Sequence, residues 1–190
     1  MEQFPQIILL NGTGSSGKTS IAKQLQEDLP YQFLNFSIDS ILYALPESDL
    51  NNMIKGETID RAGYDYAQLV DGYHRCLPSL LEAGCFLIID NAWIDTLQVK
   101  QLFKLIKNYR CCLIAVKCDL PVAQAREIKR GDRAIGLAEY EFPLVHQTMC
   151  YDFHIDSSDQ PPQQSSEKII NYLNENRIFD ALNQTLQLAK

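Results

Sequence analysis

Short apolar runs, separated by longer amphipathic stretches, dominate the pattern of hydrophobic and polar positions in this chain. Short runs of mostly apolar residues are typical of strands that are covered on both faces of a sheet. They occur at residues 7–10, 33–38, 85–90, 111–118 and 153–155. The pattern therefore predicts five buried strands.

Between these runs, apolar residues recur at helical spacing. The segments with this spacing are 20–29, 40–45, 66–82, 97–109, 122–129 and 137–146, followed by 167–174 and 179–188. Strands that alternate with helices build a parallel sheet with helices on both of its faces. We therefore predict a three-layer α/β fold with a five-stranded parallel sheet.

Two segments interrupt the alternation. Residues 46–64 show little periodicity and contain Gly56 and Gly63, so we interpret them as a long insertion near a ligand. The last amphipathic segment is either a docked helix or a frayed appendage. We expect one domain over residues 1–175 and a C-terminal helical appendage over residues 176–190.

A glycine-rich segment connects the first apolar run to the first amphipathic stretch. It matches G-x-x-x-x-G-K-[ST] in the strand-then-helix context that this motif needs, and it reads Gly12-Thr13-Gly14-Ser15-Ser16-Gly17-Lys18-Thr19. Such a loop turns its backbone N–H groups toward phosphate oxygens, and the helix N-terminus adds its positive end. We expect Lys18 to reach the β- and γ-phosphates of ATP and the Thr19 hydroxyl to coordinate Mg²⁺.

Composition and charge narrow the classes of function. The net charge is −7 and the basic residues are scattered apart from one short group, so a nucleic-acid partner is not expected. The apolar runs are far shorter than the ~20 residues that span a bilayer, so we expect no membrane partner and a cytoplasmic location. The six cysteines show no C-x-x-C spacing, which favours reduced core thiols.

Several blocks resemble a known family, the chloramphenicol 3-O-phosphotransferase-like proteins of the nucleoside-monophosphate-kinase group. The resemblance spans residues 6–157 and rests on IILLNGTGSSGKTSIAKQLQ at 7–26, SIDSILYALP at 37–46, FLIIDNAW at 86–93, VKCDLPVAQAREIKRGDRAIGLA at 116–138 and VHQTMCYDFHID at 145–156. It implies a P-loop kinase fold that uses ATP and Mg²⁺, and it leaves the acceptor open.

Two aspartates stand where the second and third predicted strands end. The resemblance implies that Asp39 is the general base that takes the proton of the acceptor hydroxyl, although it also suits an N-cap of the next helix. Asp90 is the strand-terminal acid that helps to hold Mg²⁺, or else it caps the following turn. Relatives often carry a second acid next, whereas this chain has Asn91.

Three arginines follow the fourth predicted strand. Arg126 and Arg130 are four residues apart on one helical face, and Arg133 comes shortly after Gly131. In related kinases this segment, here about residues 126–137, resembles a lid whose arginines neutralise the γ-phosphate and stack on adenine. We assign Arg130 and Arg133 to catalysis and Arg126 to nucleotide binding. A solvated basic helix end is the alternative.

Other polar and aromatic residues carry weaker signals. His146 and Asp152 are more often structural than catalytic in such a setting. Tyr43, Tyr64, Tyr66 and Trp93 line an acceptor pocket or belong to the core, and residues 156–159 coincide with the adenine loop of related enzymes.

The sequence therefore predicts a small-molecule phosphotransferase with a hydroxyl acceptor, and oligomerisation is neither required nor indicated. A kinase of another small metabolite or nucleotide, or a non-catalytic nucleotide-binding regulator, is the alternative.

Overall fold

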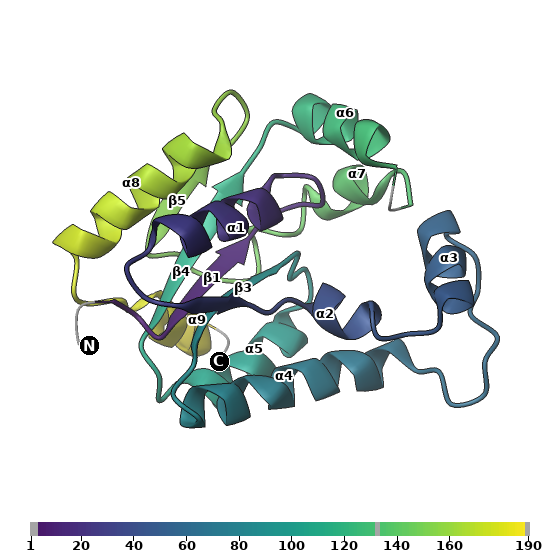
Figure 1. Ribbon diagram of the computed structural model, residues 1–190, viewed down its shortest axis with the longest axis horizontal. Coiled ribbons are helices and arrows are strands. Elements are labelled where there is room, and N and C mark those ends of the chain that lie inside the picture. The colour runs from purple at the N-terminus through teal and green to yellow at the C-terminus, as the bar shows by residue number, and fades with distance from the viewer. Residues whose placement is uncertain (1–3, 132–133, 189–190) are drawn as a thin grey trace.

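Five parallel strands form the centre of the molecule in a computed structural model that describes residues 4–131 and 134–188 (Figure 1). The strands are β1 (Ile7–Asn11), β2 (Phe33–Asn35), β3 (Phe86–Asn91), β4 (Cys111–Lys117) and β5 (Phe153–Asp156). They are arranged in the order β2-β3-β1-β4-β5, and every pair is parallel. The predicted α/β fold with a five-stranded parallel sheet is confirmed.

Helices cover both faces of the sheet. The α1 (Lys18–Asp28) and α8 (Pro162–Glu175) helices lie on one face, whereas α4 (Tyr66–Glu82), α5 (Thr96–Ile106) and α9 (Ala181–Leu188) lie on the other. Ile7 and Leu9 of β1 belong to the α4 side of the core, and Ile8 and Leu10 belong to the α1 side. Because both of their faces are buried, β1, β3 and β4 are nearly continuous apolar runs rather than alternating ones.

Four short helices surround the edge of the sheet at which β1 and β3 end. They are α2 (Ile38–Leu42), α3 (Glu47–Lys55), α6 (Leu120–Arg130) and α7 (Leu137–Glu141). Figure 1 shows α3 on one side of this edge and α6 and α7 on the other. Ligands of open α/β sheets bind at such carboxyl edges.

Several predicted boundaries differ from those of the structure, and three segments illustrate the reasons. The second strand stops at Asn35, and Ile38 opens α2, where it is buried against α4. The insertion predicted at 46–64 contains a helix, α3, with acidic residues in its first turn and left-handed Gly56 at its C-cap. The helix expected at 137–146 ends at Glu141 because Pro143 lacks the N–H group that another helical turn needs.

The last helix is docked against the domain. Asp152 Oδ1 accepts hydrogen bonds from the N–H groups of Asp180 and Ala181 at 2.9 and 3.0 Å, which caps the start of α9. Leu182 is buried in the α4-side core, and Thr185 Oγ1 accepts a hydrogen bond from the Cys150 N–H group at 2.8 Å. Of the two open alternatives for this segment, the structure therefore has the docked helix.

None of the helices within residues 4–131 and 134–188 is long and apolar enough to span a membrane. All six cysteines are free thiols; Cys111, Cys112 and Cys118 are buried, whereas Cys76 is exposed.

Candidate active site

The glycine-rich loop links β1 to α1 and is held close to β4. A Cβ atom on Gly12 would lie 2.3 Å from the Val116 carbonyl oxygen, so no larger residue fits there without moving the strand. Gly17 (φ 90°) and Ser15 (φ 59°) have left-handed conformations. A loop of this shape in front of a helix N-terminus makes a concave anion site.

Lys18 lies inside this loop. Its side chain is buried, and Nζ donates hydrogen bonds to the carbonyl oxygens of Gly12 at 2.8 Å and Thr13 at 2.7 Å. These contacts hold a positive charge at the base of the anion site.

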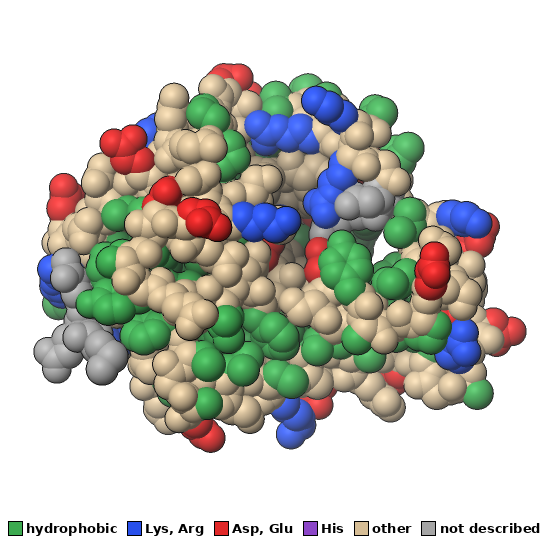
Figure 2. Space-filling model, viewed as in Figure 1, with side chains coloured by type: hydrophobic (Ala, Val, Ile, Leu, Met, Phe, Trp, Pro, Cys, Tyr) green, Lys and Arg blue, Asp and Glu red, His purple; other side chains and the backbone are tan. Residues whose placement is uncertain are grey.

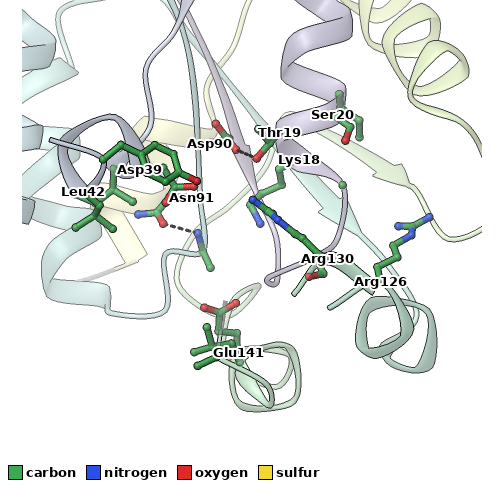
Figure 3. A pocket seen from close by; sticks show the side chains of 18 of the residues that line it. Lys18, Thr19, Ser20, Asp39, Leu42, Asp90, Asn91, Arg126, Arg130 and Glu141 are labelled. Atoms are coloured by element: carbon green, nitrogen blue, oxygen red, sulfur yellow. Dashed lines mark hydrogen bonds between the residues drawn. The ribbon is translucent and has the colours of Figure 1, made fainter. Parts of the chain in front are cut away.

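Thr19 and Asp90 meet beside Lys18, as the dashed line in Figure 3 shows. Thr19 Oγ1 donates a hydrogen bond to Asp90 Oδ2 at 2.7 Å, and Asp90 is only 6% exposed. The parallel register, which pairs Leu10 with Asp90, brings the acidic end of β3 to the loop. Two hard oxygen donors suit Mg²⁺, which usually takes one or two carboxylates and otherwise binds water and substrate phosphates. The described part of the chain holds no group of three or more His, Cys, Asp or Glu residues that could bind a metal by itself.

A cavity of about 710 Å³ opens in front of the loop. Lys18, Thr19, Asp90 and Asp39 all line it, and so do Arg126 and Arg130. In Figure 3, Asp39 and Asn91 lie on the opposite side of the cavity from Arg126, and Arg130 extends toward Lys18. The sequence-predicted residues that the structure describes are therefore brought together, whereas Arg133 lies outside the described residues.

The far end of the cavity is apolar and aromatic. Besides Asp39 it is lined by Ile38, Leu42, Tyr43, Leu50, Met53, Ile54, Tyr64 and Tyr66 from α2, α3, α4 and the connecting segment. Figure 2 shows hydrophobic side chains on the α3 side of the hollow and basic ones on the α6 side. Trp93, the other aromatic candidate, is 1% exposed and belongs to the core.

Charge concentrates at the inner wall of this cavity. Burial raises the pKa of the Tyr73 hydroxyl well above its ordinary value, and the negative charges of Asp90 and Asp39 raise it further. Tyr73 stays a neutral hydrogen-bond donor to the Phe36 carbonyl oxygen, at 3.0 Å. Asp90 and Asp39 therefore both raise the pKa of the same buried residue, Tyr73, at the acceptor side of the loop.

Arg126 ties α6 to the segment after β5. Its Nη2 donates to the carbonyl oxygens of Ser157 at 2.7 Å and Ser158 at 3.2 Å. Ser157 Oγ in turn donates to the Ser16 carbonyl oxygen at 2.6 Å. The predicted adenine loop therefore touches both the phosphate loop and the first of the three arginines.

A buried polar network supports the loop from below, and no sequence motif predicted it. Asn11 Nδ2 donates to the Val145 carbonyl oxygen at 2.9 Å and to the Tyr151 hydroxyl at 2.8 Å. Asn11 Oδ1 accepts from the backbone N–H group of Trp93 at 3.0 Å. His146 Nδ1 lies 3.1 Å from the Tyr151 hydroxyl. Burial, together with the charges of nearby basic groups, lowers the pKa of His146 to about 4.

His146 and Asp152 have structural surroundings, as we expected. His146 does not line the cavity, and Asp152 joins β4 to α9 through the Leu113 N–H group, at 2.8 Å, and the helix cap.

Glu141 is a charged lining residue that sequence reasoning missed. It ends α7, and its Oε2 accepts a hydrogen bond from the Gly14 N–H group at 2.5 Å. No motif contains this residue, because the contact joins positions 127 residues apart.

Comparison with known proteins identifies relatives of the same kind. A family model described as "Chloramphenicol phosphotransferase-like protein" matches residues 5–174. A protein of Mycobacterium tuberculosis, provisionally described as an O-phosphotransferase, is 24% identical over 181 residues, which cover 86% of this chain and 80% of that protein.

Solved structures share the fold at lower identity. An unliganded sugar kinase from Janibacter sp. superimposes with a TM-score of 0.64 at 16% identity, covering 90% of this chain and 95% of that one. Shikimate kinase from Acinetobacter baumannii, in complex with shikimate, gives a TM-score of 0.59 at 17% identity, covering 93% and 97%. Because the family model matches nearly the whole length of a chain that folds around a phosphate loop, this protein belongs to the chloramphenicol phosphotransferase-like family of P-loop kinases and is a phosphotransferase of that type.

Proposed function

We propose that this chain transfers the γ-phosphoryl group of ATP to a hydroxyl group of a small molecule. One observation carries the proposal: a single cavity holds the phosphate loop at one end and a carboxylate, Asp39, beside an apolar pocket at the other. This is the arrangement needed for direct transfer between two bound substrates.

The phosphate end of the cavity supplies positive charge. Lys18 and Arg130 line the space in front of the loop, where they would stabilise the charge on the transferring group. Thr19 and Asp90 would hold Mg²⁺, which neutralises phosphate charge when it is bound. Arg126 is fixed to the segment after β5 and would contact the nucleoside end of ATP. Arg133 remains a predicted third cation of the lid.

Asp39 would act on the acceptor. A hydroxyl oxygen of the acceptor attacks the γ-phosphorus, the bond from that phosphorus to the β–γ bridging oxygen breaks, and ADP leaves. The hydroxyl proton passes to the Asp39 carboxylate, which also orients the attacking oxygen.

The acceptor end of the cavity favours an uncharged molecule with an apolar or aromatic body. Among the described lining residues, the cations are Lys18, Arg126 and Arg130, and all three belong to the phosphate end. An anionic acceptor would bring a second negative charge close to Asp39 without a cation to pair with it. Neutral hydroxylated antibiotics fit this description, and so do other neutral metabolites.

Substitution of Asp39 tests the proposal. Asp39→Asn should cut turnover by roughly 10²- to 10⁴-fold while ATP affinity stays unchanged, the effect expected for loss of a general base. Asp71→Asn is the matched control, because Asp71 is an exposed residue of α4 that pairs with Arg75 away from the cavity. The assay is ADP release with a panel of neutral antibiotics, nucleosides and sugars and a parallel set of carboxylated or phosphorylated acceptors.

Undiminished turnover of the Asp39→Asn enzyme would refute the assignment of the base. A preference for the anionic acceptors would refute the acceptor class. Tight binding of ATP without ADP release for any acceptor would favour the nucleotide-binding regulator instead.

A further inference from the structure

A carboxylate of the protein itself occupies part of the phosphate loop. Glu141 Oε2 accepts a hydrogen bond from the Gly14 N–H group at 2.5 Å, a short distance for a bond between a carboxylate and an amide. Glu141 lines the same cavity as Lys18, and in Figure 3 it extends from α7 into the space in front of the loop.

The approach of α7 to the loop involves more than one side chain. A Cβ atom on Gly14 would lie 3.2 Å from Glu141 Oε2, 3.9 Å from the Ala138 nitrogen and 4.0 Å from the Leu137 Cβ. Both ends of the short helix therefore lie against the loop, and Gly14 is small enough to let them come close.

A buried carboxylate of α6 fixes the helix in this place. Glu127 is 4% exposed; its Oε2 accepts a hydrogen bond from the Gly136 N–H group at 2.8 Å, and its Oε1 accepts one from the Ala138 N–H group at 2.9 Å. Ala138 is fully buried. The backbone that carries Glu141 is thus anchored at its start, so the contact with Gly14 is a built feature of the fold.

A backbone N–H group has one hydrogen to donate, and phosphate oxygens need the loop amides as donors. A carboxylate and a phosphate on the same amide would also repel each other in a partly buried site. We infer that Glu141 determines the affinity for the nucleotide: its carboxylate substitutes for a phosphate oxygen on Gly14 and must be displaced when the triphosphate binds. The identity of the displacing ligand as ATP rests on the proposed function; the competition for the amide does not.

Removal of the carboxylate should therefore strengthen binding. Glu141→Gln removes the charge and keeps a weak acceptor, and Glu141→Ala removes both. We expect the dissociation constant for Mg·ATP to fall about threefold to tenfold in Glu141→Gln and further in Glu141→Ala, as loss of a competing charge-assisted hydrogen bond implies. Tripolyphosphate, which lacks the nucleoside, should show the same gain.

The matched control is Glu139→Gln, which removes the same charge from an exposed position two residues earlier in α7. Isothermal titration calorimetry of the wild type and the three variants, with both ligands, gives the comparison, and the thermal midpoint checks that each variant is folded.

Tighter binding of both ligands by the Glu141 variants, with Glu139→Gln unchanged, supports the inference. Unchanged or weaker binding overturns it, and weaker binding would indicate that Glu141 helps to hold phosphate or metal. Equal tightening in Glu139→Gln also overturns it, because net charge alone would then explain the gain.

The two ligands separate this inference from the proposed function. If the wild type binds Mg·ATP and the Glu141 variants bind it no more tightly, the proposed function stands and the inference about Glu141 is wrong. If the Glu141 variants bind tripolyphosphate more tightly but no form of the protein binds ATP, the inference stands and ATP is not the nucleotide. Protein that binds neither ligand in any form loses both.

Discussion

Asn11 connects the phosphate loop to the rest of the domain, and its removal should be costly. The side chain is fully buried at the end of β1 and makes three hydrogen bonds, to the Val145 carbonyl oxygen, the Tyr151 hydroxyl and the Trp93 N–H group. In Asn11→Ala these three bonds are lost, and the Trp93 N–H group loses its acceptor in a buried environment.

The expected loss of stability in Asn11→Ala follows from these hydrogen bonds. Each neutral hydrogen bond contributes about 1 kcal/mol, and a buried donor or acceptor left without a partner costs about 1–3 kcal/mol. Tyr151 and Val145 keep a contact with each other at 3.4 Å, so the unsatisfied cost falls mainly on Trp93. We therefore expect Asn11→Ala to lower the free energy of unfolding by about 3–5 kcal/mol.

Urea unfolding followed by tryptophan fluorescence measures this change directly. The chain has one tryptophan, Trp93, which is 1% exposed and lies in the perturbed network. Asn183→Ala is the control, because Asn183 is exposed on α9 and its side chain donates to Asp180 Oδ1 at 3.1 Å on the surface. It should change stability by less than about 0.5 kcal/mol. A loss below about 1 kcal/mol for Asn11→Ala would refute the idea that the network fixes the end of β1.

Two further predictions concern groups that sequence reasoning had left as structural. Asp152→Ala removes acceptors for three backbone N–H groups, so it should cost about 2–3 kcal/mol and speed amide hydrogen exchange in α9; equal protection of α9 in both proteins would contradict this. The pKa of His146 is lowered to about 4 in the folded chain, against about 6.5 unfolded, so the unfolded state binds its proton first. The contribution of the neutral His146 ring to the free energy of unfolding is therefore complete above pH 6.5 and is lost as the pH falls toward 4. From pH 7 to pH 5 the free energy of unfolding, measured by urea titration, should therefore fall by about 1–2 kcal/mol less in His146→Gln than in the wild type, after allowance for a partly exposed ring. Identical pH dependence of the two proteins would refute the assignment.

Local patterns in the sequence were enough to predict the layers of the fold and the phosphate loop. The five apolar runs correspond to the five strands of the sheet, because strands buried on both faces need mostly apolar residues. Glycines, Lys18 and Thr19 are adjacent in the chain, so their spacing alone predicts the loop.

The ends of the elements and the short helix α3 were harder to predict from the sequence. The boundary between β2 and α2 depends on where pairing with β3 stops, and only the register shows this. The signals of α3 were present in the sequence, in Glu47, Asp49 and Gly56 at its ends, but a helix of nine residues shows its apolar spacing only once.

The tertiary structure alone decided how the ends of separate elements meet. The Thr19–Asp90 hydrogen bond depends on parallel pairing of β1 with β3, and the Glu141–Gly14 bond depends on how α7 packs after Glu127 caps it. These partners are 71 and 127 residues apart. Local sequence determines backbone preference and burial, whereas a contact between distant polar groups exists only once the packed core has fixed their distance, and one sequence contains no record of that distance.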